Sequence, residues 1–482
     1  MLLAAVEAQA GEFRYRLHLD GKPESEPVKW SERALERRAR YGIQTDSLDL
    51  EISPRYIEQI EAAGLTIVTR SHWLNTVVVM GEEGQAVADS VFAGLHFVRR
   101  VDLLTTQQKA SAPIHPLQSA PISKAADEDC TSPLRQVNAY EPLYEAGHRG
   151  GGMLVVIVDV GFPNVDKWDW LNRQVVGVRD MYTPLSGTSK VYTSHRHGTC
   201  CLSIMASPEE HGICGVAQEA DYYLIRTETD DSETELEEDM WVAGIELADS
   251  LGADVVSSSL GYYYFDTEEN NHRYDEFCRD MAFISRGARV ACQKGMLVCN
   301  AAGNERTNDW GRLIFPADVE EVLTVGGVNP DGTLAFFSSP GFMTPYVKPD
   351  VVGRGTHCYV VTDLGDVNSS GQGTSYATPL IAGLCTSLWS AVPELSAAQI
   401  RQVVRESASQ YNQPDSLLGC GIPDFGVALA KARVLLGEVG IDEVKAETPQ
   451  RGTGLFNLQG QRCANRPRQG IFIENGRLVF RR

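Results

Sequence analysis

The chain has 482 residues, of which 22% are charged and 43% are hydrophobic, a composition typical of globular proteins rather than of disordered or fibrous ones. Its formal net charge of −21 argues against nucleic-acid or anionic-membrane partners, which are negative themselves. No run of about 18 apolar residues is present, so we expect no membrane span. At about 150 residues per domain, the length favours roughly three domains.

The first ten residues, MLLAAVEAQA, end in an A-x-A pattern similar to the end of a secretory signal. They lack a basic start, and Glu7 interrupts a very short apolar run. The segment is therefore either the remnant of a longer signal or without significance.

Residues 11–104 predict a small α+β domain in the order strand, helix, strand, strand, helix, strand, which is the split βαβ plan. Apolar residues alternate with polar ones from Phe13 to Leu19, which predicts a half-buried first strand. An additional short helix is expected over 31–40. Residues 105–132 contain three prolines among Ala, Ser and Gln, which indicates an exposed linker open to proteolytic nicking.

Residues 133–435 alternate short apolar strands with helical patterns, as expected of one α/β domain. Several strands are continuous Val/Ile/Leu runs, which are typical of a parallel sheet buried on both faces. The strands are expected at 153–158, 222–226, 254–258, 296–299 and 322–325. Residues 436–482 predict a short β-rich tail with a hairpin turn at Asn475-Gly476.

The eleven cysteines show no repeated C-x-x-C, which argues against a zinc site. Most lie in apolar stretches and are interpreted as small buried hydrophobic residues. One or two disulfides are also compatible with the sequence, which does not pair them.

Four segments of the α/β domain carry groups suited to catalysis. The strand VVIVD ends at Asp159, and the segment HGTCCLSIMA begins at His197. Asn304 in CNAAGNE follows another apolar strand, and Ser375 in GTSYATPLIAG precedes a small-residue helix. Because the carboxyl ends of strands in an open α/β sheet collect the active site, Asp159 and Asn304 are expected there.

Asp, His and Ser in this chain order on an α/β sheet are the subtilisin arrangement. Over roughly residues 135–435 the sequence resembles the subtilase family of serine endopeptidases, which implies a subtilisin-like parallel sheet flanked by helices. By this resemblance Asp159, His197 and Ser375 form a catalytic triad that works through an acyl-enzyme. His195 is the rival candidate for the base, but the His-Gly-Thr frame favours His197.

The same resemblance assigns further residues and partners. Asn304 and the Ser375 backbone N–H would form the oxyanion hole. Ser259, Leu260 and Gly261 resemble the substrate-binding strand of the family. Protein or peptide substrates are implied, with no cofactor required for the chemistry and with structural calcium whose ligands the sequence does not identify.

Subtilase propeptides are small split-βαβ domains, so residues 11–104 are interpreted as an intramolecular inhibitor and folding chaperone. The alternative is an unrelated interaction domain. The protein is thus expected to be a secreted or cell-surface zymogen that is processed within 105–132. The competing hypotheses are a catalytically silent subtilase-like binding protein and an intracellular peptidase.

Three features depart from the subtilase pattern, and an acidic segment stands apart from it. Val160 follows Asp159 where Ser or Thr is usual, Cys200, Cys201 and Ser203 follow His197, and Tyr376 replaces a common Met. Eight of the twelve residues in 228–239 are acidic. We interpret them as a solvated loop and helix start with a capping box of Thr234 and Glu237; a calcium site or an acidic rim that favours basic substrates is the alternative.

Overall fold

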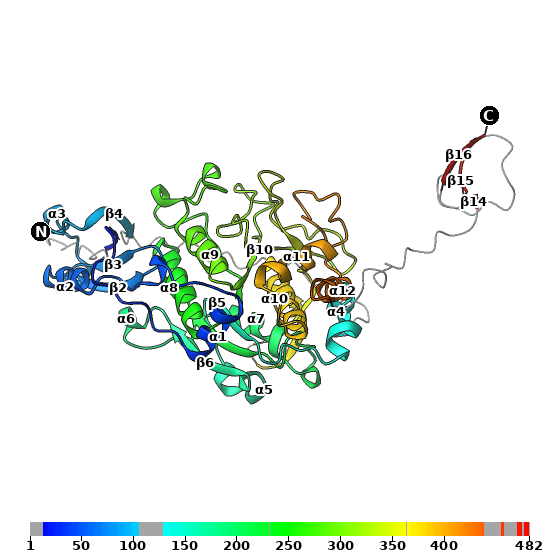
Figure 1. Cartoon of the computed structure of the whole chain (residues 1–482), viewed down its shortest axis with the longest axis horizontal. Coiled ribbons are helices and arrows are strands. Elements are labelled where there is room, and N and C mark those ends of the chain that lie inside the picture. The colour runs from blue at the N-terminus through cyan, green and yellow to red at the C-terminus, as the bar shows by residue number, and fades with distance from the viewer. Residues whose placement is uncertain are drawn as a thin grey trace, which may run out of the picture. The chain divides into compact units, whose positions relative to one another are not determined.

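The computed structural model describes residues 13–105, 129–230, 232–362 and 364–437, together with the strands of the C-terminal tail (Figure 1). The proposed signal remnant and most of the proposed linker lie outside the described residues. The chain forms two compact units, divided between Ala432 and Arg433. Within the described ranges, no helix combines the length and apolar character needed to cross a bilayer.

The N-terminal part of the first unit is a four-stranded antiparallel sheet with helices on the connections, as predicted. The spatial order β2-β3-β1-β4 is the split βαβ arrangement. Ser31 caps the additional helix α1 by accepting a hydrogen bond from the Ala34 N–H at 3.1 Å. The elements are β1 (Arg14–Leu19), α1 (Glu32–Arg40), α2 (Pro54–Ala62), β2 (Thr66–Ser71), β3 (Thr76–Met80), α3 (Asp89–Gly94) and β4 (Val98–Thr105).

The prediction that the first strand is half-buried is wrong. Tyr15, Leu17 and Leu19 face the small core of the N-terminal domain, but Arg16 between them is buried as well, and His18 is partly buried. Arg16 is only 3% exposed because its guanidinium pairs with Asp239 at 2.5 Å and lies 3.9 Å from the Phe283 ring centroid. Both faces of the strand are therefore covered, one by its own domain and the other by the α/β domain.

The α/β domain is built on a seven-stranded sheet in the order β11-β10-β9-β8-β5-β7-β6, with its neighbouring strands parallel. The predicted continuous apolar strands are confirmed. The strands are β5 (Leu154–Asp159), β6 (Val175–Asp180), β7 (Asp221–Arg226), β8 (Val255–Ser258), β9 (Leu297–Ala301), β10 (Leu323–Val328) and β11 (Val351–Arg354), with a separate pair β12 (Cys358–Val361) and β13 (Val367–Gly371). The helices are α4 (Ser132–Gln136), α5 (Asp169–Asn172), α6 (Thr183–Ser186), α7 (His197–Ala206), α8 (Leu236–Leu251), α9 (Phe283–Gln293), α10 (Thr374–Ala391), α11 (Ala397–Ser407) and α12 (Phe425–Leu435).

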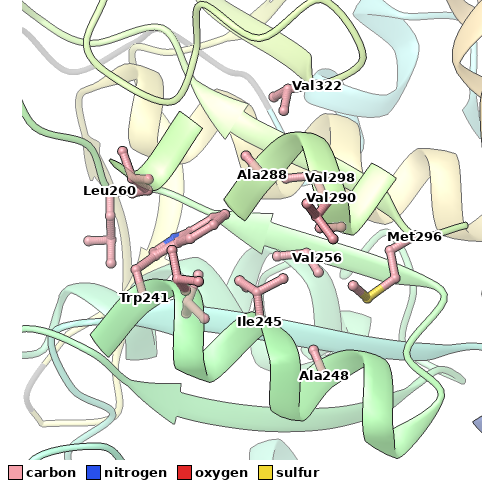
Figure 2. Packing of buried hydrophobic residues seen from close by; sticks show 14 of the residues in the cluster. Trp241, Ile245, Ala248, Val256, Leu260, Ala288, Val290, Met296, Val298 and Val322 are labelled. Carbon is pink, nitrogen blue, oxygen red and sulfur yellow. The ribbon is translucent and has the colours of Figure 1, made fainter. Parts of the chain in front are cut away.

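Helices α8 and α9 cover one face of this sheet. Figure 2 shows Trp241, Ile245 and Ala248 along one side of α8, facing the strand residues Val256 and Val298. Alternate residues of β5 share this core, so the residues between them point to the other face. Helices α7 and α10, which pack against each other, carry His197 and Ser375.

One disulfide joins Cys130, just before α4, to Cys214 after α7. It ties the start of the α/β domain to the loop that follows the His197 helix. The eight other described cysteines are free, and six of them are buried as expected. Cys463 lies outside the described residues.

The second unit contains a three-stranded antiparallel sheet of β14 (Leu455–Phe456), β15 (Gly470–Glu474) and β16 (Arg477–Arg481). Glu474 pairs with Arg477 across the predicted hairpin. The strands of the tail are thus where the sequence predicts them.

Candidate active site

Asp159 and His197, which are 38 residues apart in the chain, face each other directly. Asp159 is the last residue of β5 and is fully buried, and both of its carboxylate oxygens lie 2.9 Å from Nδ1 of His197. The Val160 N–H donates a further hydrogen bond to Asp159 Oδ1 at 2.9 Å. The carboxylate therefore fixes the Nδ1 side of the imidazole and leaves Nε2 for another partner.

The Gly after His197 is needed for this approach. A Cβ at Gly198 would lie 2.8 Å from the Cβ of Asp159 and 2.5 Å from the Gly161 carbonyl oxygen. Any side chain would push the first turn of α7 away from β5. The His-Gly pair thus has a steric reason in addition to a chemical one.

The environment favours a protonated His197. Burial lowers the pKa of His197, but the charge of Asp159 and the hydrogen bond with it raise that pKa, and the balance lies well above 6.5. By contrast, burial raises the pKa of the nearby Cys201 thiol, which therefore stays neutral near pH 7.

Ser375 occupies the first turn of α10 and is 7% exposed. Its backbone carbonyl accepts a hydrogen bond from the Ser259 hydroxyl at 2.7 Å, and its own hydroxyl donates to the Ser259 carbonyl at 3.4 Å. A hydroxyl has a single proton, so in this structure that proton is directed to Ser259 and not to His197.

Cys201 connects the two halves of the site. Its Sγ lies 4.0 Å from His197 Nδ1 and donates to the Ser375 carbonyl at 3.5 Å. The ring of Tyr376 lies against the imidazole, with 5.7 Å between the ring centroids. Cys201 and Tyr376 thus contribute to the packing between α7 and α10. The sequence marked them only as departures from the usual pattern.

Asn304 lies beside the start of α10. Its Oδ1 accepts hydrogen bonds from the Thr374 N–H at 2.9 Å and from the Thr374 hydroxyl at 3.1 Å. Because the oxygen is occupied in this way, Nδ2 is the group of this amide that is free to donate. Thr374 was missed at the sequence level as an orienting residue, although it stands directly before Ser375 in the Gly-Thr-Ser motif.

Leu260 and Gly261 follow Ser259 along an extended segment after β8. The Leu260 carbonyl accepts from the buried Asn300 amide at 3.1 Å. The next residue, Tyr262, bridges to Phe315 through two backbone hydrogen bonds of 2.9 and 3.0 Å. A Cβ at Gly261 would lie 2.6 Å from Ile314, so this close approach of backbones requires glycine.

The interpretation of residues 228–239 as a solvated loop and helix start is wrong for the helix start. Glu237, Glu238 and Asp239 are at most 3% exposed, because Glu238 pairs with His272 at 3.0 Å and Asp239 with Arg16. The predicted capping box is incomplete: no side chain caps the start of α8, whereas the Glu237 carboxylate interacts with the backbone N–H groups of Thr229, at 2.9 Å, and of Thr234.

Glu228 at the start of this segment lies close to the Asp159–His197 pair. Burial foremost, together with the charge of Asp159, raises the pKa of Glu228 to about 7, against a hydrogen bond of 2.7 Å from the Tyr262 hydroxyl. The burial of Glu228 could not be predicted from the sequence, where it is the first residue of an acidic run that precedes a helix.

Among the described residues, no three carboxylates bring their oxygen atoms within 4.8 Å of one another. Two groups of three candidate ligand side chains bring their ligand atoms within 4.8 Å of one another: Asp159 with His197 and Cys201, and Glu209 with Cys130 and Cys214. The first is the candidate site itself. In the second, both thiols are consumed by the disulfide.

The comparisons with known proteins agree with this geometry. The model of the Subtilase family matches residues 152–421, which is more than half of the chain. The chain belongs to the subtilase family. A second model, the Peptidase S8 propeptide domain of Bacteroidota, matches residues 22–117, so this subtilase carries a propeptide domain and is a serine endopeptidase made as a zymogen.

Relatives of this subtilase include Subtilisin DY of Bacillus licheniformis, 28% identical over 272 residues that cover 56% of this chain and 88% of that protein. An intracellular serine protease of Paenibacillus polymyxa is 28% identical over 241 residues, 49% of this chain and 66% of that protein. Among solved structures, the MycP3 protease of the type VII (ESX-3) secretion system has a TM-score of 0.50 and 20% identity, covering 64% of this chain and 89% of that chain. The last likeness supports the subtilisin-like fold.

Proposed function

We propose that Asp159, His197 and Ser375 are the catalytic triad of this subtilase, with Asn304 as an oxyanion donor. The observation that carries the proposal is the Asp159–His197 pair, which Cys201 links to the Ser375 carbonyl in the first turn of α10. The proposed substrates are proteins or peptides, and Ser259, Leu260 and Gly261 are proposed to bind the substrate backbone.

The proposed reaction begins when the Ser375 hydroxyl turns from the Ser259 carbonyl towards His197 Nε2. Ser375 Oγ then attacks the substrate carbonyl carbon while His197 takes the proton, and His197 later delivers it to the leaving amine. Asp159 holds the imidazole and stabilises the imidazolium. Water hydrolyses the acyl-enzyme with His197 again as the base, which returns the free serine.

The negative oxygen that forms during attack has two proposed donors. One is Nδ2 of Asn304, whose amide is oriented by Thr374. The other is the backbone N–H of Ser375, which belongs to the first turn of α10, where N–H groups have no partner within the helix. The positive end of the α10 dipole lies at the same place.

We further propose that residues 11–104 inhibit the enzyme until the chain is cut within 105–132, leaving a catalytic domain over 133–435 and a tail over 436–482. The Bacteroidota propeptide match and the close packing of the N-terminal sheet on α8 support this. Export from the cytoplasm is part of the proposal and is supported by the Cys130–Cys214 disulfide, since disulfides persist in oxidising compartments. One relative is described as an intracellular serine protease. Cell fractionation of the native host tests whether this protein is exported.

The experiment compares wild type with Ser375→Ala, and with Ser390→Ala at the far end of the same helix as a control. Wild type and the control should react with a fluorophosphonate and lose about a quarter of their residues by processing. Ser375→Ala should do neither. If Ser375→Ala is labelled and processed like wild type, the triad is wrong; if no form is labelled, the chain is a silent binding protein.

A further inference from the structure

A second contact region between the N-terminal and catalytic parts lies away from the active site. It is formed by residues 31–49, named here the arginine arm, which contains α1 and the turn that follows it. In Figure 1, α1 is separate from the N-terminal sheet and lies near the end of α8. The Ser31 N–H donates to the Ser250 carbonyl and its hydroxyl to the Leu251 carbonyl, both at 2.9 Å.

Three arginines of α1 point at carboxylates of the catalytic part. Arg33 pairs with Asp254 and donates to the Gly252 and Gly152 carbonyls at 3.0 and 2.9 Å. Arg37, which is 3% exposed, donates to Asp249 and to the Ala253 carbonyl. The Arg38 guanidinium reaches the second oxygen of Asp249 at 3.2 Å, and this aspartate is itself only 1% exposed.

The far end of the arm is held by the opposite arrangement of charges. Lys294, a residue of the catalytic part that is 2% exposed, lies 3.0 Å from both Asp46 and Asp49 of the arm. The Tyr41 hydroxyl donates to the Pro393 carbonyl at 3.0 Å. Charge complementarity thus runs along the whole arm.

Glycines on the catalytic side give the arm room to approach closely, to its backbone at Gly252 and to a side chain of the arm at Gly295. A Cβ at Gly252 would lie 2.5 Å from the Ala34 nitrogen, and one at Gly295 would lie 2.5 Å from the Ile43 side chain. Both glycines have positive φ values, 82° and 86°, and end helices α8 and α9. The surface is therefore shaped for the arm as well as charged for it.

The arm lies at the opposite edge of the sheet from the active site. Its contacts Gly152 and Asp254 lie within two residues before the starts of β5 and β8, whereas Asp159 and Ser258 end these strands. In a parallel sheet these two ends face opposite directions. A contact there does not depend on what occupies the substrate cleft.

We propose that the end of α8 and the starts of β5 and β8 form a docking site for the arginine arm that works independently of the cleft. Its occupant is residues 31–49 of this chain, and it keeps the N-terminal domain on the catalytic domain after the linker is cut. The inference rests on the proposed function only in that the linker is the site of cutting. Two contact regions on one rigid domain reinforce each other, so losing the cleft contact alone does not release the domain.

The test uses the full chain with Ser375→Ala, a C-terminal tag, and a recognition site for an added sequence-specific protease placed within 106–128. After cutting, the chain is immobilised by the tag and release of the N-terminal fragment is followed over time at about 0.15 M salt. The variants are Arg37→Ala and, as a matched control, Arg99→Ala, which removes an exposed pair with Asp20 inside the N-terminal domain.

After cutting, the parent chain should retain its fragment. Arg37→Ala should release it about 30-fold faster, the low end for truncating one partner of a buried, hydrogen-bonded charge pair. Arg99→Ala should match the parent. Asp249→Asn on the catalytic side should also accelerate release. The release rate of the double variant with Arg37→Ala should rise by less than the product of the two single fold-changes. Thermal unfolding of each uncut chain verifies folding.

Release at the parental rate from both Arg37→Ala and Asp249→Asn overturns the proposal, as does immediate loss of the fragment from the parent. Since an added protease makes the cut, these results do not depend on Ser375. If the wild-type chain fails to process itself while the Ser375→Ala chain retains its fragment in this assay, the proposed autoprocessing is refuted and the docking site still stands.

Discussion

Removing the proposed oxyanion donor tests the active-site assignment most directly. Asn304→Ala deletes Nδ2, and it also deletes the Oδ1 that accepts from Thr374. Asn304→Asp keeps an oxygen for Thr374 and replaces only the amino group. The pair of variants therefore separates the loss of the donor from the loss of local packing.

The expected loss follows from the number of hydrogen bonds removed. One amide donor to a developing oxyanion is worth about 10²–10³ in kcat, or about 2.7–4 kcal/mol, a range found for the corresponding donor of a subtilisin. Asn304→Asp should lose at least as much, because its charge lies next to the forming oxyanion. Thr374→Val removes the neutral orienting hydrogen bond to Asn304 and also the acceptor of the Gly303 N–H at 3.2 Å, and it should cost about twofold to tenfold in kcat.

The assay is steady-state hydrolysis of a neutral peptide by the processed enzymes, with active sites counted by fluorophosphonate labelling. The donor acts mainly on the transition state, so the loss should be in kcat and not in KM. An Asn304→Asp enzyme whose kcat stays within about threefold of wild type, or whose loss is entirely in KM, would refute the reasoning.

Further predictions concern charge and pH. Because Asp159 holds the pKa of His197 well above 6.5, kcat/KM should rise with pH through a midpoint above 6.5, and Asp159→Asn should lower that midpoint; a profile flat from about pH 5 to 9 would contradict a histidine base. The pKa of Glu237 is raised well above 4.5 by burial foremost and then by the charges of Glu233 and Glu228. The folded state therefore binds the Glu237 proton more tightly than the unfolded state, and the free energy of unfolding falls as the pH rises past 4.5. In the inactive Ser375→Ala chain, Glu237→Gln should therefore raise the melting temperature at pH 8 more than at pH 5; an equal change at both would count against it. Asp350→Asn should lower the free energy of unfolding, measured in urea, by about 3–5 kcal/mol, because the fully buried Asp350 carboxylate pairs with Lys348 at 2.7 Å. A loss below about 1 kcal/mol would mean that other groups stabilise the Lys348 charge.

Much of the fold could be predicted from local patterns. Continuous apolar runs identify the parallel strands, because a strand covered on both faces has no place for polar residues. A catalytic group that directly follows such a run must lie at the carboxyl edge of the sheet, which is why Asp159 and Asn304 could be placed there. Glycine is needed at positions 198 and 303, because a side chain there would collide with Asp159 and with Ser339, respectively. Both glycines stand within the sequence motifs.

What the sequence alone determined is the order of the elements and the residues that end the strands, since periodicity and strand termini are local properties of the chain. Tertiary structure alone decided which charges are buried. Arg16 and Asp239 are separated by 223 residues, and the disulfide joins cysteines 84 residues apart. The acidic start of α8 resembles a solvated face until distant residues supply its partners, Arg16 of the N-terminal domain for Asp239 and His272 of the α/β domain for Glu238. A charge can be buried only where an opposite charge or a donor meets it.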